Sequence, residues 1–451
     1  MAAESLAADV CRDAVVVLPG IMGSELVEAS TGRVLWGLAD VRWYVDAWTT
    51  GDSLAALHVT DDERDGRTGR VRATRLLRFP AFAPKMRGFE PYAKLLATAR
   101  HAAAHPDAVL PFPYDWRLSV AHTAGRLAEA ADDHLRAWRA HPHGSRDARL
   151  VLIAHSMGGL VAAAFMTDLG GARDVRTLIT LGTPFSGAVL AAGLLGPGRG
   201  GRLPLPHRRL RALARGLPGL HELLPGYPCV REPGGRFRRF TADDAATLGG
   251  DRELAQQALD RQDKLRTHHL PQLRAVVGVG QRTGQSVTLC GGEAEVHELV
   301  PAGTGITDRR GDGTVYRDAA APAGEKPFYV PQSHGALARS AEALAHVGAT
   351  LTERPLGERL GAGEVGLYVP DVVSAGEPWP VEVEAVAGVG AAGCQVFDAA
   401  TNLETERPRL RVRDGRLWGQ ARPTGPGLYR VEATSGGYSA VRQYVLVVEH
   451  G

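Results

Sequence analysis

Residues 149–159 read Arg-Leu-Val-Leu-Ile-Ala-His-Ser-Met-Gly-Gly, a sequence that predicts a strand, a sharp turn and the start of a helix. The run 149–154 is mostly apolar, which is typical of a strand buried on both faces. A helical pattern follows over residues 157–169. Ser156 therefore stands at a strand-to-helix turn, where a serine projects its hydroxyl at the end of a sheet. The small residues Ala154, Gly158 and Gly159 allow strand and helix to approach closely.

Three further apolar runs predict strands of the same kind, over residues 14–18, 175–182 and 275–279. Amphipathic patterns between them predict helices over residues 91–104 and 122–139. Apolar strands that alternate with amphipathic helices imply a mostly parallel sheet with helices on both faces. The first part of the chain, residues 1–355, is therefore predicted to form one α/β domain.

Two stretches interrupt this alternation and are predicted to be insertions, over about residues 33–85 and 187–262. The first contains Trp36, Trp43 and Trp48, three of the seven tryptophans, and we expect it to form a lid-like cover. Amphipathic aromatic side chains suit a lipid interface, so these tryptophans are candidate substrate or lid residues.

The composition changes near residues 355–363, after which short alternating segments are separated by turn residues. This spacing predicts a small antiparallel β-sandwich, immunoglobulin-like in plan, over residues 363–451. We expect this sandwich to carry no catalytic residue, and the sequence identifies no protein partner for it. The segments cover residues 366–369, 381–386, 394–397, 410–412, 428–433 and 441–448.

The overall composition excludes several classes of protein. Hydrophobic residues make up 44% and charged residues 23% of the 451 residues, which excludes wholesale disorder, and the net charge of +2 gives no basis for nucleic-acid binding. The N-terminus lacks the basic start and long apolar run of a signal peptide, so we expect a cytoplasmic protein. We expect neither a metal nor an organic cofactor. The four cysteines, far apart and in no metal-binding spacing, are Cys11, Cys229, Cys290 and Cys394.

A serine hydroxyl is a weak nucleophile at neutral pH and needs a base that an acid orients. Where the serine stands at a strand-to-helix turn, the acid and then the histidine follow it in the chain. Three acids, Asp308, Asp312 and Asp318, lie in one short segment before His334, so the order of residues does not choose among them. Asp312 alone stands between two glycines, which allow a sharp turn. We therefore expect Ser156, Asp312 and His334 to form a catalytic triad.

Acyl transfer also needs hydrogen-bond donors for the negative charge that develops on the carbonyl oxygen. The backbone N–H of Met157, directly after the candidate nucleophile, is one such donor. The second is expected from a loop after an early strand, and Pro19-Gly20-Ile21-Met22-Gly23-Ser24 follows the strand at residues 14–18. We assign it to the N–H of Ile21, because the glycines in this loop let the backbone approach a ligand.

The sequence resembles the lecithin:cholesterol acyltransferase-like family, a branch of the α/β-hydrolases that includes lysosomal phospholipase A2 and phospholipid:diacylglycerol acyltransferases. The resemblance covers roughly residues 14–350, and the Pro-Tyr-Asp-Trp-Arg block and the first loop are its branch-specific motifs. Within that block, we interpret Asp115 paired with Arg117 as a structural clamp. The motifs, in family order, are Val16-Val17-Leu18-Pro19-Gly20-Ile21-Met22-Gly23-Ser24, Pro113-Tyr114-Asp115-Trp116-Arg117, Ala154-His155-Ser156-Met157-Gly158-Gly159, Leu181-Gly182-Thr183-Pro184-Phe185, Gly311-Asp312-Gly313-Thr314-Val315 and Ser333-His334.

This resemblance implies an α/β-hydrolase fold with lid or cap insertions. The tryptophan-rich stretch falls where the family carries its lid and membrane-contacting insertion. The chain lacks the signal peptide and lid cysteines of the secreted members, and the resemblance does not extend beyond residue 363. The roles it implies are those assigned above: Ser156 as nucleophile, Asp312 as acid, His334 as base, and Ile21 and Met157 as oxyanion donors.

We therefore expect a serine-dependent enzyme that transfers or hydrolyses acyl groups of lipids, in the manner of a phospholipase or lipase, through an acyl-enzyme. Its substrate is a lipid or another acyl ester, and we expect transient contact with a membrane surface. Two alternatives stay open. One is a soluble carboxylesterase that never touches a membrane, and the other is an inactive scaffold whose β-sandwich binds a partner.

Overall fold

A six-stranded sheet forms the centre of the molecule, in the order β15-β10-β7-β6-β1-β5, and every pairing in it is parallel. Its strands are β1 (Ala14–Leu18), β5 (Val109–Pro111), β6 (Leu150–His155), β7 (Val175–Leu181), β10 (Leu273–Gly278) and β15 (Phe328–Val330). The computed structural model describes residues 10–37, 55–82, 88, 90–196, 207–302, 305–355, 365–385, 392–413, 416–423, 425–435 and 439–449.

The four predicted strands are confirmed, and the two edge strands, β5 and β15, are additions to the prediction. Each edge strand has only three residues, which is too few for an apolar pattern to stand out. The inner strands β1 and β6 are buried along their whole length, because helices cover both of their faces.

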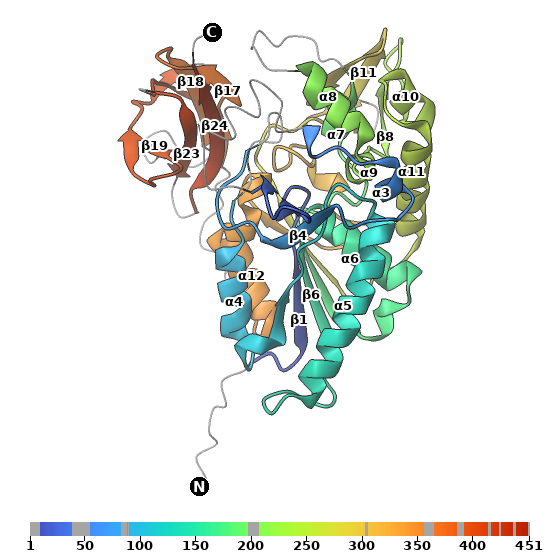
Figure 1. The fold of residues 1–451 in the computed structure, drawn as a ribbon. Coiled ribbons are helices and arrows are strands. Elements are labelled where there is room, and N and C mark those ends of the chain that lie inside the picture. The colour runs from blue at the N-terminus through green and yellow to red at the C-terminus, as the bar shows by residue number, and fades with distance from the viewer. Residues whose placement is uncertain are drawn as a thin grey trace.

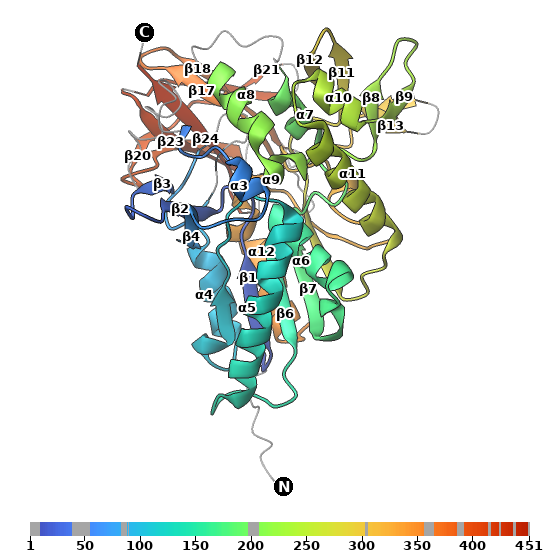
Figure 2. The ribbon, with the colours of Figure 1, turned by 45° about the vertical axis from the view of Figure 1, so that its right-hand side comes forward.

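The predicted helices are also confirmed. α4 (Ala93–Ala102) connects β1 to β5, whereas α5 (Val120–Ala140) and α6 (Met157–Asp168) lead in the opposite direction across the sheet. Because parallel crossovers are right-handed, α5 and α6 lie on the face opposite to α4, and Figures 1 and 2 show this arrangement. α12 (Ala341–Leu351) follows β15 and packs beside α4.

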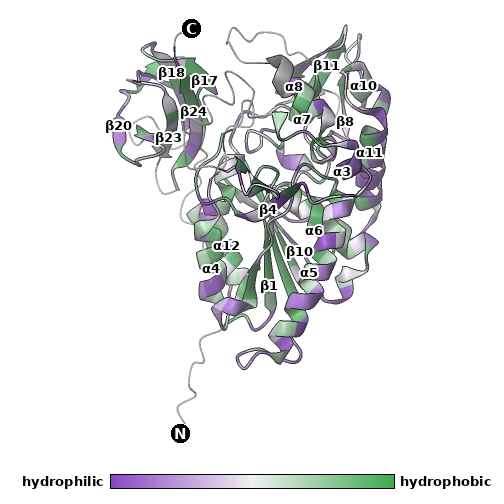
Figure 3. Ribbon diagram, in the orientation of Figure 1, coloured by the Kyte–Doolittle hydropathy of each residue, from purple (hydrophilic) through white to green (hydrophobic). Residues whose placement is uncertain are grey.

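The apolar residues of the sheet and the helices meet in one core. Figure 3 shows apolar central strands and, on the surrounding helices, a mixture of apolar and polar residues. α5 buries Ala124, Leu127, Ala131 and Leu135 at helical spacing, whereas the first ten residues of α6 are buried all round. Among the residues that the structure describes, no helix is both long enough and apolar enough to cross a membrane.

Two groups of elements stand at the carboxyl ends of the central strands. The first is a three-stranded sheet in the order β3-β2-β4, formed by β2 (Ser24–Glu28), β3 (Val34–Trp36) and β4 (Val71–Leu76), with the short α3 (Asp61–Arg64). The second group lies between β7 and β15 in the chain, and Figure 1 shows it in green and yellow. It comprises α7 (Val189–Leu195), α8 (His207–Gly216), α9 (Pro218–His221), α10 (Ala242–Thr247), α11 (Arg252–Thr267), β8 (Pro228–Arg231), β9 (Phe237–Arg239), β11 (Ser286–Cys290), β12 (Glu293–His297), β13 (Val300–Ala302) and β14 (Gly305–Thr307).

Two further sheets, formed by residues 365–449, pack face to face and are called the C-terminal sandwich below. Their orders are β16-β18-β22-β21 and β17-β24-β23-β19-β20. Side chains from both sheets, among them Leu367, Val383, Val431 and Val445, share one apolar core. The predicted antiparallel β-sandwich is confirmed, and one edge pair in it, β17 with β24, runs parallel. The strands are β16 (Val365–Tyr368), β17 (Val372–Ser374), β18 (Trp379–Ala385), β19 (Ala392–Asp398), β20 (Glu404–Glu406), β21 (Arg411–Arg413), β22 (Arg416–Ala421), β23 (Gly427–Ser435) and β24 (Val441–Val448).

Candidate active site

Ser156 occupies the turn between β6 and α6, as the sequence predicts. Its backbone angles, φ 51° and ψ −126°, are ones that a non-glycine residue rarely adopts, and they are typical of the strained turn that exposes a nucleophilic serine. The turn requires its glycines. A Cβ atom on Gly158 would lie 2.4 Å from the carbonyl oxygen of Pro19, and a Cβ atom on Gly159 would lie 1.9 Å from Oγ1 of Thr183.

His334 stands between Ser156 and Asp312. Its Nε2 atom lies 2.8 Å from Oγ of Ser156, and its Nδ1 atom lies 2.7 Å from Oδ2 of Asp312. Because an ionised carboxylate only accepts hydrogen bonds, Nδ1 carries the proton, and Nε2 accepts the hydrogen bond that the serine hydroxyl donates. All three residues are buried, with exposed fractions of 3% for Ser156, 6% for His334 and 1% for Asp312.

Asp312 is the one of the three candidate acids that contacts His334. Its second carboxylate oxygen, Oδ1, accepts the backbone N–H of Thr314 at 2.9 Å and that of Val315 at 2.7 Å, which fixes the carboxylate in place. Asp308 instead accepts hydrogen bonds from a glutamine side chain and from a backbone N–H of its own loop. Asp318 lies near two arginines of its own segment.

Gly182 lies beneath the contact between Asp312 and His334. Its φ of 63° is in the left-handed region, where glycine is favoured. A Cβ atom at this position would lie 3.1 Å from Oδ2 of Asp312 and 3.2 Å from Nδ1 of His334. The sequence shows Gly182 only as part of a family motif, and the structure adds the reason why a side chain does not fit there.

The loop after β1 packs directly against Ser156. A Cβ atom on Gly20 would lie only 2.8 Å from Cβ of Ser156, so this position leaves no room for a side chain. Within the part of the chain that the structure describes, neither the N–H of Ile21 nor that of Met157 has a hydrogen-bond partner. Within those residues both N–H groups are thus unused, and they belong to the residues directly after Gly20 and Ser156.

His155 joins the two sides of this site, a role that the sequence does not reveal. Its Nε2 atom lies 3.0 Å from the backbone carbonyl oxygen of His334, and its Nδ1 atom lies 2.8 Å from the hydroxyl of Tyr92. A carbonyl only accepts, so His155 carries its proton on Nε2, and Tyr92 donates to Nδ1. The oxygen of Tyr92 in turn accepts the N–H of Gly20 at 2.9 Å.

This arrangement requires a neutral imidazole at His155. Burial disfavours the charged form, and the nearby His334 adds to this effect, so that the pKa of His155 falls to about 3. The chain from Gly20 through Tyr92 and His155 to the backbone of His334 therefore keeps fixed proton positions at neutral pH.

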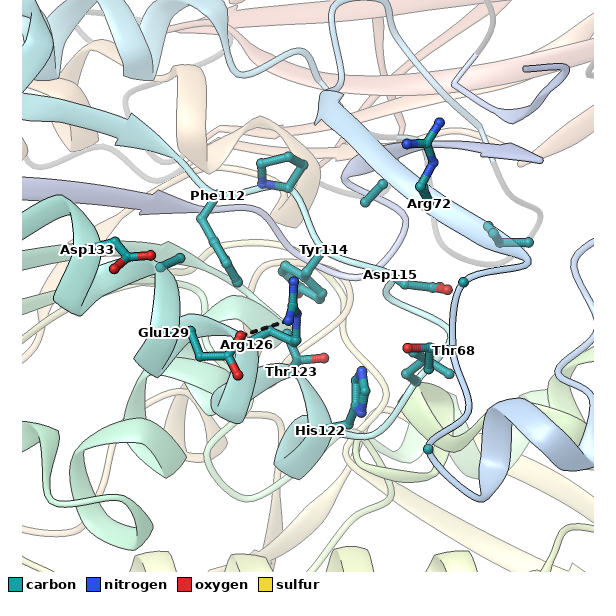
Figure 4. Close-up of a pocket in the computed structure, with 17 residues that line it drawn as sticks. Thr68, Arg72, Phe112, Tyr114, Asp115, His122, Thr123, Arg126, Glu129 and Asp133 are labelled. Atoms are coloured by element: carbon teal, nitrogen blue, oxygen red, sulfur yellow. Dashed lines mark hydrogen bonds and ion pairs between the residues drawn. The ribbon is translucent and has the colours of Figure 1, made fainter. Parts of the chain in front are cut away.

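One cavity of the structure lies away from the triad. It has a volume of about 750 Å³ between β4, residues 112–118 and α5, and none of its lining residues belongs to the triad. Figure 4 shows its charged side chains, among them Arg126 paired with Glu129 at 2.7 Å. Asp115 lines the cavity, but its carboxylate accepts two hydrogen bonds from the guanidinium of the buried Arg117, at 2.9 and 2.6 Å, and a third from the backbone N–H of Arg117 at 3.1 Å. Asp115 and Arg117 thus form the clamp expected from the sequence.

Trp36 does not have the position of a lid residue. It ends β3, is fully buried, and its indole N–H donates to the carbonyl oxygen of Met22 at 2.8 Å. Its ring meets that of Trp116 edge-on, with 5.7 Å between the centroids. The large apolar ring fills the space between the β3-β2-β4 sheet and the segment of Trp116, so the lid expectation is wrong for this residue. Trp43 and Trp48 lie outside the described residues.

One group of described side chains, His105, Asp107 and His141, has the spacing of metal ligands. These residues precede β5 and β6, at the amino ends of the strands, whereas Ser156 lies at the carboxyl end of β6. Nδ1 of His105 accepts the N–H of Asp107, and Nδ1 of His141 accepts the N–H of His143. Each imidazole thus stabilises the turn in which it stands, and both lie at the amino ends of the strands, opposite to the end that carries Ser156.

Comparisons with known proteins find one family model that matches part of the chain and several similar solved structures. Residues 82–247, which include Ser156, match the family model for lecithin:cholesterol acyltransferase. A structure of the Tle4–Tli4 complex contains a chain 16% identical to this one, with a TM-score of 0.51, and the match covers 75% of this chain and 98% of that one. The mature form of the lipase BlEst2 of Bacillus licheniformis is 11% identical, with a TM-score of 0.37 and coverage of 76% and 92%. No curated protein matches the sequence.

The family match covers the serine turn and the segment that leads to it, and the architecture around them is a parallel sheet with a serine at a strand-to-helix turn. Residues 82–247 thus resemble the lecithin:cholesterol acyltransferase family, and the architecture is that of an α/β-hydrolase followed by a C-terminal β-sandwich.

Proposed function

We propose that this protein is a serine-dependent enzyme that transfers or hydrolyses acyl groups of lipid esters through an acyl-enzyme. The family match supports the general class, which is an acyltransferase or an ester hydrolase. The observation that carries the finer proposal is the buried chain of hydrogen bonds from Ser156 through His334 to Asp312.

In the first half of the reaction, His334 takes the hydroxyl proton of Ser156 at Nε2 while Oγ attacks the ester carbonyl. The N–H groups of Ile21 and Met157 stabilise the oxyanion of the tetrahedral intermediate. Asp312 keeps the proton on Nδ1 and stabilises the imidazolium. The imidazolium then gives its Nε2 proton to the leaving alkoxide, and the acyl group remains on Ser156.

In the second half, His334 takes a proton from an acceptor hydroxyl, whose oxygen attacks the acyl-enzyme. The acceptor is a lipid alcohol in transfer and water in hydrolysis, so the same residues serve both reactions. The proton then returns to Oγ of Ser156 as the product leaves. We propose that the acyl donor is a lipid, reached by transient contact with a membrane surface.

The test combines a fluorophosphonate probe with product analysis. We expect the probe to label Ser156, and mass spectrometry of a mixed panel of phospholipids and alcohols to detect free fatty acid or a new ester. Turnover of short soluble esters without any phospholipid turnover would instead favour a soluble carboxylesterase. A folded protein that neither takes the label nor turns over any ester would contradict the proposed function.

A further inference from the structure

The segment that leads into His334 is fastened to the C-terminal sandwich by the side chain of Gln332. Its Nε2 atom donates to the carbonyl oxygen of Ala440 at 3.0 Å, and its Oε1 atom accepts the N–H of Arg442 at 3.2 Å. The same Oε1 atom accepts the N–H of Ser333 at 3.0 Å, and the hydroxyl of Ser333 donates to the carbonyl oxygen of Arg442 at 2.5 Å. The two residues before His334 are therefore bound to the start of β24.

A second glutamine makes the matching contact beside Asp312. The Nε2 atom of Gln281 donates to the carbonyl oxygen of Val365 at 2.7 Å, and its Oε1 atom accepts the N–H of Leu367 at 3.1 Å, both in β16. The backbone of Gln281 also pairs with Gly311 in both directions, at 2.9 and 3.1 Å. Gly311 directly precedes Asp312, so Gln281 joins the loop of the candidate acid to the sandwich.

The two contacts have the same form. In each, one side-chain amide donates to a carbonyl of the sandwich and accepts an N–H of the sandwich, so both of its polar groups are used there. The exposed fractions are 0% for Gln281 and 1% for Gln332, so water does not replace a lost partner without a rearrangement. Such a paired contact fixes both the distance and the direction between a loop and the segment that it binds.

Charged and apolar contacts support the same docking. Arg310, two residues before Asp312, donates to Glu384 of β18 at 2.5 Å. Tyr444 of β24 packs so closely on Gly88 that a Cβ atom there would lie 2.7 Å from its ring. Figures 1 and 2 show the sandwich beside the upper end of the central sheet, where the strands have their carboxyl ends. The sandwich residues that join the core of residues 10–355 are Val372, Leu428, Tyr444, Leu446 and Val448.

We propose that the C-terminal sandwich is a working part of the active site, and that Gln281 and Gln332 are the positioning residues through which it holds the loops of Asp312 and His334. This inference rests on the proposed function of the triad. A sandwich that only recruited a partner would have no need for paired buried amides on both of these loops. If a contact is lost, the loop is free to shift, and a displacement of about 1 Å at a catalytic group can cost about 100-fold in rate.

The test uses Gln281→Ala, Gln332→Ala and the double variant in the full chain, with one soluble ester as substrate. Gln262→Ala is the matched control, because Gln262 of α11 is also buried and its amide donates to the carbonyl oxygen of Leu224 at 2.6 Å, without any hydrogen bond to the described residues of the sandwich. We expect kcat to fall about 10- to 100-fold in each loop variant, with KM changed less than about threefold. The control should keep kcat within about twofold.

Gln281→Met and Gln332→Met keep most of the side-chain volume and remove the hydrogen bonds, and they replace any Ala variant that circular dichroism shows to be unfolded. Folded loop variants with the kcat of Gln262→Ala would overturn the inference. Ser156→Ala is measured in parallel. If it is inactive while the loop variants are fully active, the positioning role fails and the triad stands, whereas an active Ser156→Ala means that the proposed function itself fails.

Discussion

The imidazole of His155 donates a hydrogen bond from Nε2 to the backbone carbonyl oxygen of His334, 3.0 Å away. The Nδ1 atom of the same ring accepts a hydrogen bond from the hydroxyl of Tyr92. The oxygen of that hydroxyl accepts a hydrogen bond from the N–H of Gly20. The residue next to the candidate nucleophile thus links the backbone of the candidate base to the loop of the candidate oxyanion donor. One neutral ring sets the spacing of these three parts of the site.

Removing this link should slow the reaction without removing any group of the triad. We expect His155→Gln and Tyr92→Phe each to lower kcat by about tenfold with little change in KM, because the loops of His334 and Ile21 lose their shared support. His134→Gln is the control, since His134 also contacts a backbone carbonyl, that of Ala108, which stands at the amino end of β5, whereas Ser156 follows the carboxyl end of β6. Steady-state kinetics on a soluble ester check this. Equal rates for His155→Gln and His134→Gln would argue against the link.

His155 should also make stability depend on pH. In the folded chain the imidazole of His155 stays neutral as pH falls, down to its pKa of about 3. In the unfolded chain the same imidazole takes up a proton below about pH 6.5. The unfolded state therefore binds more protons between these values, and the free energy of unfolding falls as pH falls from about 6.5, by up to about 1.4 kcal/mol per pH unit.

Urea unfolding of the wild type and of His155→Gln measures this contribution at about pH 7 and pH 5.5. Other buried histidines, such as His134 and His221, contribute to both proteins alike and cancel in the difference. We expect the wild type to lose about 1 kcal/mol more than the variant between the two pH values. An identical pH dependence in both proteins would mean that His155 titrates normally in the folded state.

Gly20 should tolerate no side chain. In Gly20→Ala the new Cβ atom would lie 2.8 Å from Cβ of Ser156 and 3.1 Å from Nδ1 of His155, so the loop or the serine must move. We expect a loss in kcat of about 10- to 100-fold. Gly125→Ala, where a Cβ atom meets nothing within 4 Å, should leave kcat unchanged and leave the helix as stable or more so. A wild-type kcat in Gly20→Ala would show that the loop leaves room for a methyl group beside Ser156, in contradiction to the 2.8 Å approach.

Asp312, rather than Asp308 or Asp318, should behave as the acid of the triad. Asp312→Asn should lower kcat about 10²- to 10⁴-fold with little effect on binding, because the carboxylate no longer fixes the proton on Nδ1 of His334. Asp308→Asn and Asp318→Asn should cost far less. The kcat of the three variants on one ester, with folding checked by circular dichroism, decides this. A crippled Asp308→Asn beside a normal Asp312→Asn would reverse the assignment.

The parts of the fold that depend on local pattern are predictable from the sequence. β1 and β6 are fully apolar because both of their faces are covered, and the turn at Ser156 carries the small residues that its geometry needs. The three side chains of the candidate triad come together as expected because the carboxyl ends of parallel strands meet at one edge of the sheet. Local sequence thus predicts the scaffold and the meeting of these three side chains.

The supporting contacts are not predictable in the same way, because they join residues far apart in the chain and leave no local pattern. Gln281 and Gln332 resemble ordinary loop glutamines until the sandwich strands are placed beside them. His155 resembles a packing residue until Tyr92 and the carbonyl of His334 appear on its two nitrogens. For Trp36 the sequence suggests a functional role that the structure does not support. An aromatic residue that suits a lipid interface also suits a protein core, and Trp36 is buried in the core.

The turnover of a soluble ester by Ser156→Ala decides whether the triad is catalytic. Ser156 sits in a tight, strained turn, and alanine removes only Oγ, so the fold should be unchanged by circular dichroism. We predict a loss in kcat of about 10³-fold or more, with His334 and Asp312 still in place. A folded Ser156→Ala protein that keeps a large part of the wild-type kcat would contradict the serine mechanism.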